Sequence, residues 1–250
     1  MRHSDRPVFV TGAGSGIGRG TALLMAREGA HVACSDLDET TLCETVELIE
    51  KTGGRALGIR CNVADRDAVG AAVDQAAKEL GGLQALCNVA GTGCFAHTED
   101  VTADEWNHIV AVNLSGTFFA SQAALPHLLR NKRSAIVNVA SVAGLNGQAY
   151  SAAYCASKAG VVGLTKALAV EYVKRGLRVN CVCPAGVKTP MMGRFVPPEG
   201  ADPDLVSRLG LVLKFTHPEE VAEAIVYLAS KAARSMNGVA LPMDFGLTAT

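Results

Sequence analysis

Short apolar runs alternate with longer stretches of helical periodicity along the whole chain. The runs contain few polar residues, as expected for strands covered on both faces of a sheet, and they are 7–11, 31–35, 56–61, 85–88, 135–141, 178–183 and 239–243. Helical stretches separate them at 18–28, 38–52, 65–80, 106–131, 151–175 and 218–230. Repeated strand–helix units of this kind predict an α/β fold, doubly wound around a central parallel sheet of about seven strands with helices on both faces.

Polar residues mark the expected starts of several helices. An N-cap or a first-turn acid is predicted at Asp38, Asp65, Thr102 and Thr216. No linker or internal repeat divides residues 1–250, so we expect one domain. The irregular segment 189–216 carries four prolines, a Met-Met pair and several large apolar side chains. We interpret it as a substrate-binding loop, the alternative being an inert surface excursion.

Composition narrows the possible partners. Hydrophobic residues make up 49% of the chain and charged residues 19%, and the net charge is −1. No basic run suggests nucleic acid, and no uninterrupted apolar run approaches the roughly 20 residues of a membrane span. The polar first seven residues do not resemble a signal peptide. We therefore expect a cytoplasmic protein whose partner is a small molecule.

The eight cysteines and six histidines suggest neither disulfides nor a metal centre. None of the cysteines forms Cys-x-x-Cys, and Cys181 and Cys183 are expected to point to opposite faces of a strand. The histidines lack His-Glu-x-x-His or another ligand cluster. We expect buried, reduced thiols and no metal.

A glycine-rich turn follows the first apolar run. Gly12, Gly16 and Gly18 have the spacing Gly-x-x-x-Gly-x-Gly, which differs from the Gly-x-Gly-x-x-Gly fingerprint. The physical task is the same, because glycines allow a tight turn beside a pyrophosphate and the helix N-terminus offers free N–H groups. A plain strand-to-helix connection is the alternative.

Asp36 ends the second apolar run. A carboxylate at this place can accept hydrogen bonds from the adenosine ribose and repel a 2′-phosphate. The neighbouring positions Ser15 and Leu37 are not basic, so they would not neutralise such a phosphate. The sequence therefore favours NAD over NADP, unless Asp36 only marks the entry to the next helix.

Tyr154 and Lys158 stand four residues apart in an apolar stretch. On a helix they share one face, and a nearby ammonium favours the phenolate form, which makes Tyr154 a candidate general base. A base that takes a hydroxyl proton beside a dinucleotide that takes a hydride would form an alcohol dehydrogenase site. The spacing is common, and alone it is a weak signal.

In combination these motifs resemble the short-chain dehydrogenase/reductase family in its compact form, a Rossmann-type fold. The resemblance extends from Val8 to the C-terminus, and its motifs are Thr11-Gly-Ala-Gly-Ser-Gly-Ile-Gly18, Asn88-Val-Ala-Gly91, Asn113, Ser141, Tyr154-Cys-Ala-Ser-Lys158 and Asn180-Cys-Val-Cys-Pro-Ala-Gly-Val-Lys-Thr189. It implies a catalytic tetrad. Tyr154 would be the acid or base, Lys158 would lower its pKa and bind the nicotinamide ribose, Ser141 would hold the substrate oxygen, and Asn113 would order a relay water.

The resemblance also implies a set of cofactor contacts. They are Gly12, Ser15, Gly16, Ile17, Gly18, Asp36, Leu37, Asn62, Val63, Asn88, Ala90, Tyr154, Lys158, Pro184, Val187 and Thr189. Four positions depart from the family pattern. Asn62 stands where Asp is usual, Val89 replaces an Asn, Ala185 replaces a Gly, and Phe245 interrupts an Asp-Gly-Gly.

These observations together predict an NAD-dependent oxidoreductase that interconverts a secondary alcohol and a ketone. A largely apolar pocket is expected from Gln148, Ala149, Met191, Met192, Phe195 and Val196, with Arg194, Arg208 and Lys214 more often solvated than bound to an anion. The alternatives are a 3-oxoacyl thioester reductase and a non-catalytic NAD-binding regulatory protein. The resemblance further implies a homotetramer built partly on helices 106–131 and 151–175.

Overall fold

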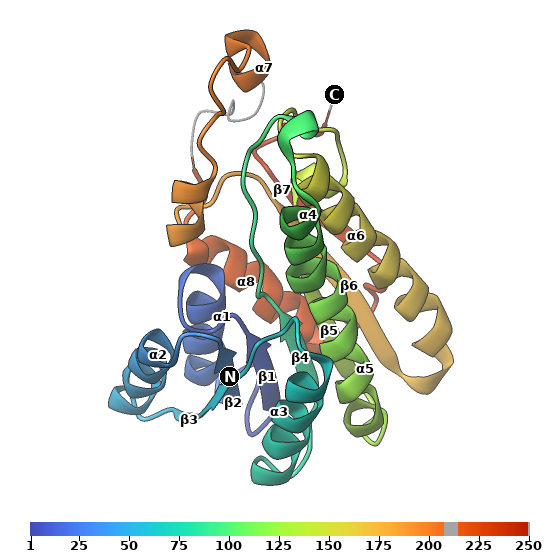
Figure 1. The fold of residues 1–250 in the computed structure, drawn as a ribbon. Coiled ribbons are helices and arrows are strands. Elements are labelled where there is room, and N and C mark those ends of the chain that lie inside the picture. Colours follow the sequence, from blue (N-terminus) through green and yellow to red (C-terminus); the bar gives the residue numbers. More distant parts are fainter. Residues whose placement is uncertain (208–214, 250) are drawn as a thin grey trace.

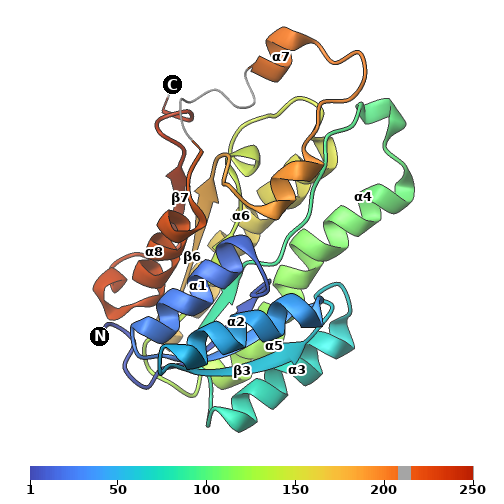
Figure 2. The ribbon, with the colours of Figure 1, turned by 90° about the vertical axis from the view of Figure 1, so that its left-hand side faces the viewer.

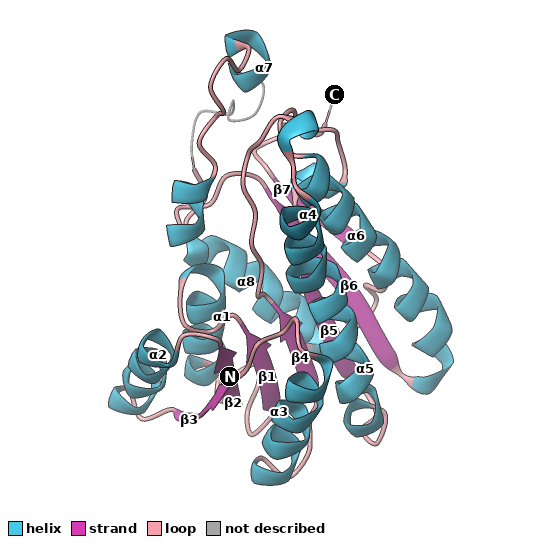
Figure 3. Cartoon of the chain, viewed as in Figure 1, coloured by secondary structure: helices cyan, strands magenta, loops and turns pink. Residues whose placement is uncertain are grey.

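In the computed structural model, which describes residues 1–207 and 215–249, seven parallel strands form one sheet in the order β3-β2-β1-β4-β5-β6-β7 (Figures 1 and 3). The strands are β1 (Pro7–Thr11), β2 (His31–Asp36), β3 (Arg55–Arg60), β4 (Ala85–Asn88), β5 (Ser134–Val139), β6 (Leu177–Pro184) and β7 (Ala240–Met243). The chain order reverses between β1 and β4, which creates the crevice where ligands bind in such sheets. The predicted doubly wound α/β architecture is confirmed.

Helices cover both faces of the sheet (Figure 2). One face carries α1 (Gly16–Arg27), α2 (Glu39–Lys51) and α8 (Pro218–Ala229). The other carries α3 (Arg66–Glu79), α5 (Gly116–Leu128) and α6 (Ala152–Tyr172). The short helices α4 (Ala103–Val110) and α7 (Pro203–Ser207) extend beyond the carboxyl ends of the strands.

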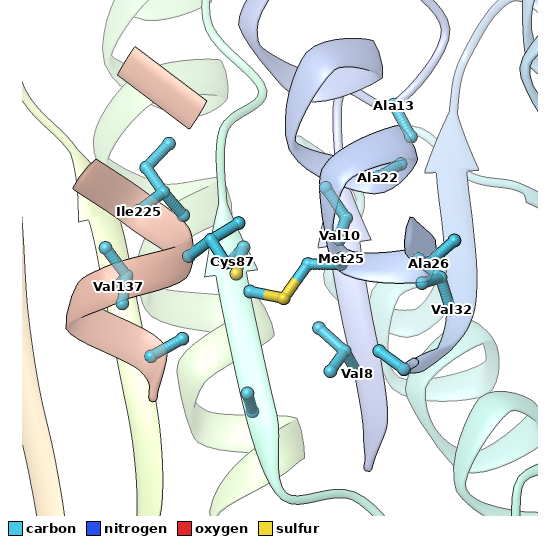
Figure 4. Packing of buried hydrophobic residues seen from close by; sticks show 14 of the residues in the cluster. Val8, Val10, Ala13, Ala22, Met25, Ala26, Val32, Cys87, Val137 and Ile225 are labelled. Carbon is cyan, nitrogen blue, oxygen red and sulfur yellow. The ribbon is translucent and has the colours of Figure 1, made fainter. Parts of the chain in front are cut away.

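Alternation along the strands divides the core into two layers. Val8 and Val10 of β1 pack with Met25 of α1 and Ile225 of α8, as Figure 4 shows, whereas Phe9 between them packs on the opposite face. Successive side chains of a strand point to opposite faces, so a strand buried on both sides must be apolar throughout. This explains why the strands appear in the sequence as unbroken apolar runs.

Three of the four predicted caps are confirmed. Asp38 accepts a hydrogen bond from the backbone N–H of Thr41, Asp65 does so from the first turn of α3, and Thr102 shares a reciprocal cap with Glu105. The prediction for Thr216 is wrong. The N-cap of α8 is His217, while the backbone of Thr216 pairs with the segment 186–188.

The predicted helix 106–131 is interrupted. A π-helical turn, Ala111–Ser115, joins α4 to α5, and it contains Asn113. Such turns are rare and often lie at functional sites. By length and composition alone the whole helical run Ala103–Leu128 could cross a membrane. Here its α5 part packs against α3 and the sheet, so it serves as a core helix.

All eight cysteines are free, and five are buried. The prediction that Cys181 and Cys183 face opposite sides is wrong, because residues i and i+2 of a strand share a face. Both belong to one small cluster with Ala140, Val161 and Val162. They fill the space between β6 and α6.

Candidate active site

A cavity of about 340 Å³ opens at the carboxyl ends of the strands, between the nucleotide turn and the segment 189–207. Ser141, Tyr154 and Lys158 line it together, although they come from the end of β5 and from α6. Three of the four residues proposed from sequence for catalysis therefore meet at one site, and the fourth, Asn113, does not line the cavity. The surrounding wall is mostly apolar.

Tyr154 and Lys158 are both buried, with 7% and 3% of their residue surfaces exposed. The Nζ atom of Lys158 lies 5.7 Å from the centroid of the Tyr154 ring and donates a hydrogen bond to the Val139 carbonyl at 2.9 Å. One of the three ammonium protons is thus used to fix the side chain against β5. The others remain able to contact a ligand.

Burial dominates the proton affinities of this pair. It raises the pKa of Tyr154 to about 12, and the hydroxyl of Ser141 is the neighbour that lowers it. Burial also lowers the pKa of Lys158 to about 8. The proposed lowering of the Tyr154 pKa by Lys158 stays a prediction, because in the protein alone burial of the phenol dominates. Removing the phenol from water disfavours the phenolate more than its neighbours stabilise it.

Ser141 lies where β5 gives way to a short 3₁₀ turn. Its hydroxyl accepts a hydrogen bond from the backbone N–H of Ala143 at 3.2 Å and donates weakly to the Pro184 carbonyl at 3.4 Å. Ser141 and Tyr154 line the same cavity, so one hydroxyl and one phenol are available there to a ligand.

Asn113 is fully buried and organises the floor of the site. Its side-chain oxygen accepts from the backbone N–H of Thr92, and its amide nitrogen donates to the Thr92 carbonyl and to Ser157. Ser157 in turn donates to the carbonyl of Tyr154. The chain of bonds connects the π-helical turn to α6, so Asn113 has structural partners whose identity the sequence did not reveal. The relay water stays a prediction.

The glycine-rich turn forms a cradle that fits a pyrophosphate. Gly12 and Gly16 have φ angles of +67° and +50°, which other residues rarely adopt. A Cβ atom on Gly16 would lie 2.9 Å from Thr189, so this glycine lets the turn touch the segment after β6. Ser15 makes no side-chain cap and the first turn of α1 contains no acid. The free N–H groups and the positive dipole end of α1 are therefore available to an anion.

Asp36 stands at the adenosine end of the crevice. Its carboxylate accepts hydrogen bonds from the backbone N–H of Gly14 at 2.8 Å and of Asp38 at 3.1 Å. Arg60, its register partner on β3, donates to the Leu37 carbonyl at 3.2 Å. A basic residue thus lies nearby in space, although Ser15 and Leu37, adjacent in the motif, are not basic.

Three of the other predicted cofactor residues, Pro184, Val187 and Thr189, line the cavity. The backbone N–H of Ala90 donates to the Thr11 hydroxyl, and the side chain of Asn62 accepts from the N–H of Ala64. Asn88 points into the core instead. Its amide donates to Ser121 and Asn138 and so ties together α5, β4 and β5. The Val89 departure places an apolar side chain against the core beside it.

Four of the six predicted pocket residues line the cavity, namely Gln148, Met191, Met192 and Phe195. Ala149 and Val196 do not, and Val196 is 65% exposed. Arg194 donates to Thr92 at 3.1 Å at the edge of the site, and Arg208 and Lys214 lie outside the described residues. The sequence analysis assigned no role to Phe245, which also lines the cavity, and it missed further apolar lining residues that no motif marks: Phe95, Val206, Phe215 and Leu247.

The loop 189–207 is attached to its surroundings at several points. Phe195 packs edge-on against both Phe95 and Tyr154, with ring centroids 5.0 and 5.2 Å apart. Tyr150 accepts a hydrogen bond from the backbone N–H of Asp202 at 2.7 Å. An aromatic side chain of the loop therefore packs directly against the ring of Tyr154.

No group of three or more His, Cys, Asp or Glu side chains within residues 1–207 and 215–249 is arranged to hold a metal ion. The chemistry available to this part of the chain comes from the phenol, the ammonium, the hydroxyl and the anion cradle. Such a set suits proton transfer beside a bound dinucleotide.

Known proteins share both the sequence and the fold. The chain is 38% identical over 251 residues to 2-(S)-hydroxypropyl-CoM dehydrogenase 3 of Xanthobacter autotrophicus, an alignment covering 99% of this chain and 98% of that protein. It is 37% identical to a 3-oxoacyl-(acyl-carrier-protein) reductase of Thermotoga maritima, covering 99% of each. It is also 37% identical to meso-2,3-butanediol dehydrogenase of Serratia marcescens, covering 100% of this chain and 97% of that one.

Two solved structures show the same likeness. A short chain dehydrogenase from Mycobacterium paratuberculosis bound to NAD matches with a TM-score of 0.93 and 28% identity over 100% of both chains. One from Burkholderia cenocepacia in complex with NADP matches with a TM-score of 0.89 and 33% identity over 99% of this chain and 100% of that one. The family model for short chain dehydrogenases matches residues 6–200. The chain therefore belongs to the short-chain dehydrogenase family, as its motifs indicated.

Proposed function

We propose that this protein is an NAD-dependent dehydrogenase of an apolar secondary alcohol. The observation that carries the proposal is the meeting of Ser141, Tyr154 and Lys158 in one apolar cavity beside an uncapped helix N-terminus. The relatives named for hydroxypropyl-CoM and butanediol dehydrogenation support a secondary alcohol. The apolar lining supports a substrate with substantial hydrocarbon surface.

The side chains divide the chemistry between them. The bound dinucleotide supplies the hydride acceptor and, when oxidised, a positive charge that favours the phenolate. Tyr154 removes the hydroxyl proton of the alcohol, and Ser141 holds the same oxygen through its hydroxyl. Lys158 stabilises the phenolate and binds the nicotinamide ribose. In the direction of reduction, Tyr154 returns the proton to the ketone oxygen.

The choice of NAD over NADP follows from Asp36. Its carboxylate is fixed by two backbone N–H groups and would repel a 2′-phosphate. Arg60 lies on the neighbouring strand and reduces that repulsion to some degree. Since related structures contain either dinucleotide, the preference is a property to be measured for this chain.

A 3-oxoacyl thioester reductase is the second candidate, favoured by the Thermotoga maritima relative. Reduction of that kind generally uses NADP in this family, so Asp36 disfavours it. A non-catalytic regulator is disfavoured because all four residues of the catalytic tetrad are present.

The decisive experiment measures nicotinamide reduction with NAD and NADP over a panel of secondary alcohols and 3-hydroxyacyl thioesters. We expect turnover with NAD and an uncharged cyclic or branched alcohol. Turnover confined to NADP and thioesters would replace the proposal with the reductase. Binding of NAD without turnover of any compound in the panel would favour the regulatory protein.

We also propose a homotetramer and a cytoplasmic location. Large apolar side chains stay exposed on the helices expected at the interface, among them Trp106, Phe118, Val170 and Val173. Burying such residues between copies would remove them from water. Light scattering after size-exclusion chromatography gives the mass, and a monomer at micromolar concentration would contradict the assembly. The location stays a prediction.

A further inference from the structure

The backbone at Phe245 is left-handed. Its φ angle is +53°, a conformation that bulky side chains rarely adopt because the Cβ atom crowds the backbone. The residue follows β7, and its ring lines the catalytic cavity while 53% of its surface is exposed. Neither the strained backbone nor the exposed ring stabilises the folded chain.

Neighbouring groups hold this conformation in place. The buried carboxylate of Asp244 accepts hydrogen bonds from the N–H of Gly246, the N–H of Thr248 and the Thr248 hydroxyl, at 3.0, 2.8 and 2.6 Å. The carbonyl of Met243 accepts from the N–H of Ala185, which anchors the turn to the end of β6. The left-handed turn is therefore fixed from both sides.

Strain that the surrounding structure maintains is a sign of function when it lies at a ligand cavity. A glycine at position 245 would relieve the backbone and leave the wall of the cavity open. Phenylalanine at the same place supplies an aromatic face that is already positioned before a ligand arrives. Leu247, two residues later, extends the same apolar surface into the cavity.

We propose that Phe245 is a specificity-determining residue that contacts the hydrocarbon part of the substrate and favours cyclic or branched alcohols over short ones. This inference rests on the proposed alcohol dehydrogenase function for the identity of the ligand. The contact forms in the ground-state complex, so removing the ring weakens binding without altering the reacting groups.

The test compares Phe245→Gly with the wild type in the presence of saturating NADH. Cyclohexanol and 2-propanol are the probes, and their dissociation constants are measured by saturation-transfer NMR, which needs no turnover. We expect roughly tenfold weaker binding of cyclohexanol to the variant and unchanged binding of 2-propanol. The melting temperature stays the same or rises, because glycine accepts a positive φ without strain.

Arg133→Gly is the matched control. Arg133 also has a positive φ angle, +78°, and lies on the loop before β5, away from the cavity. Its replacement should leave the binding of both alcohols unchanged. The proposal is overturned if wild type and Phe245→Gly bind cyclohexanol equally, if neither binds it, or if the variant loses NADH affinity by the same factor. The alcohol panel with NAD tests the proposed function separately.

Discussion

The two ends of the active site are built in different ways. The part proposed to hold the adenosine and the pyrophosphate lies mostly within residues 12–63, and there the backbone offers most of the contacts, through the glycine turn and the free N–H groups of α1. The substrate end gathers side chains from segments near residues 95, 141, 154, 191, 215 and 245. The dinucleotide, which the whole family shares, is thus matched by a local sequence motif. The substrate, which varies, is matched by side chains that only the tertiary fold brings together.

This difference explains which changes each end tolerates. At the nucleotide end a Cβ atom on Gly12 would lie 2.8 Å from the backbone of Ala90, so almost any substitution there collides. At the substrate end, apolar residues of similar size can replace one another while the wall remains intact. Tyr154, the proposed acid or base, lies where the nucleotide end and the substrate end meet.

The largest effect is expected at that boundary. Tyr154→Phe removes the phenol that we propose exchanges a proton with the alcohol oxygen, so kcat should fall by at least about 10³-fold. NAD binding, followed by calorimetry, should remain close to that of the wild type because the cradle is unchanged. Tyr227→Phe, on α8, is the matched control and should retain full activity. A Tyr154→Phe enzyme with substantial turnover would remove Tyr154 from its role.

A smaller effect tests the nucleotide end alone. Asp36→Asn keeps an acceptor for the N–H of Gly14 but removes the charge, and Asp36→Ala removes both. We expect each variant to lower the preference for NAD, measured as kcat/KM with NAD divided by kcat/KM with NADP, by roughly tenfold. The reason is that repulsion of the 2′-phosphate is lost. If only the alanine variant changes the ratio, the turn geometry matters and the charge does not. An unchanged ratio in both would place the discrimination elsewhere, with Arg60 the first candidate.

A several-fold effect should connect the loop to the chemistry. Phe195→Ala removes the ring that packs edge-on against Tyr154, and water would then reach the phenol. Because burial is the main cause of its raised pKa, hydration should lower that pKa and move the rise of the pH–rate profile to lower pH. The profile of kcat/KM between about pH 6 and pH 10 measures this. Leu48→Ala, an exposed position on α2, should leave the profile unchanged.

The contrast between the two ends also explains which features could be predicted from the sequence. Strand runs, helix caps at Asp38 and Asp65, and the glycine turn depend on neighbours within a few residues, so the pattern revealed them. The inward amide of Asn88 depends on partners from other elements, Ser121 and Asn138. The interruption of the helix at Asn113 serves a contact with Thr92, which lies outside that helix. No local spacing encodes such contacts.

The smallest effect concerns the scaffold rather than either end of the site. His3 is fully buried, its Nε2–H donates a hydrogen bond to the Val226 carbonyl of α8 at 3.0 Å, and burial lowers its pKa from 6.5 to about 4. Between these pH values His3 is protonated in the unfolded chain but neutral in the folded chain. The free energy of unfolding therefore decreases as pH falls from about 6.5 towards 4, by at most roughly 1.4 kcal/mol per pH unit.

His3→Gln removes the titrating group and should reduce the drop in melting temperature between pH 7 and pH 5. The hydrogen bonds with Arg2 lower the pKa of Glu28 to about 2, so the contribution of Glu28 to stability is lost only below pH 4.5. Glu28 therefore does not affect the comparison of melting temperatures between pH 7 and pH 5. Equal drops in the variant and the wild type would assign the acid sensitivity to other groups. His3 lies near the amino ends of the strands, whereas the cavity lies at their carboxyl ends. The variant should therefore keep the KM values for NAD and alcohol, so that the effect on stability is measured separately from any effect on activity.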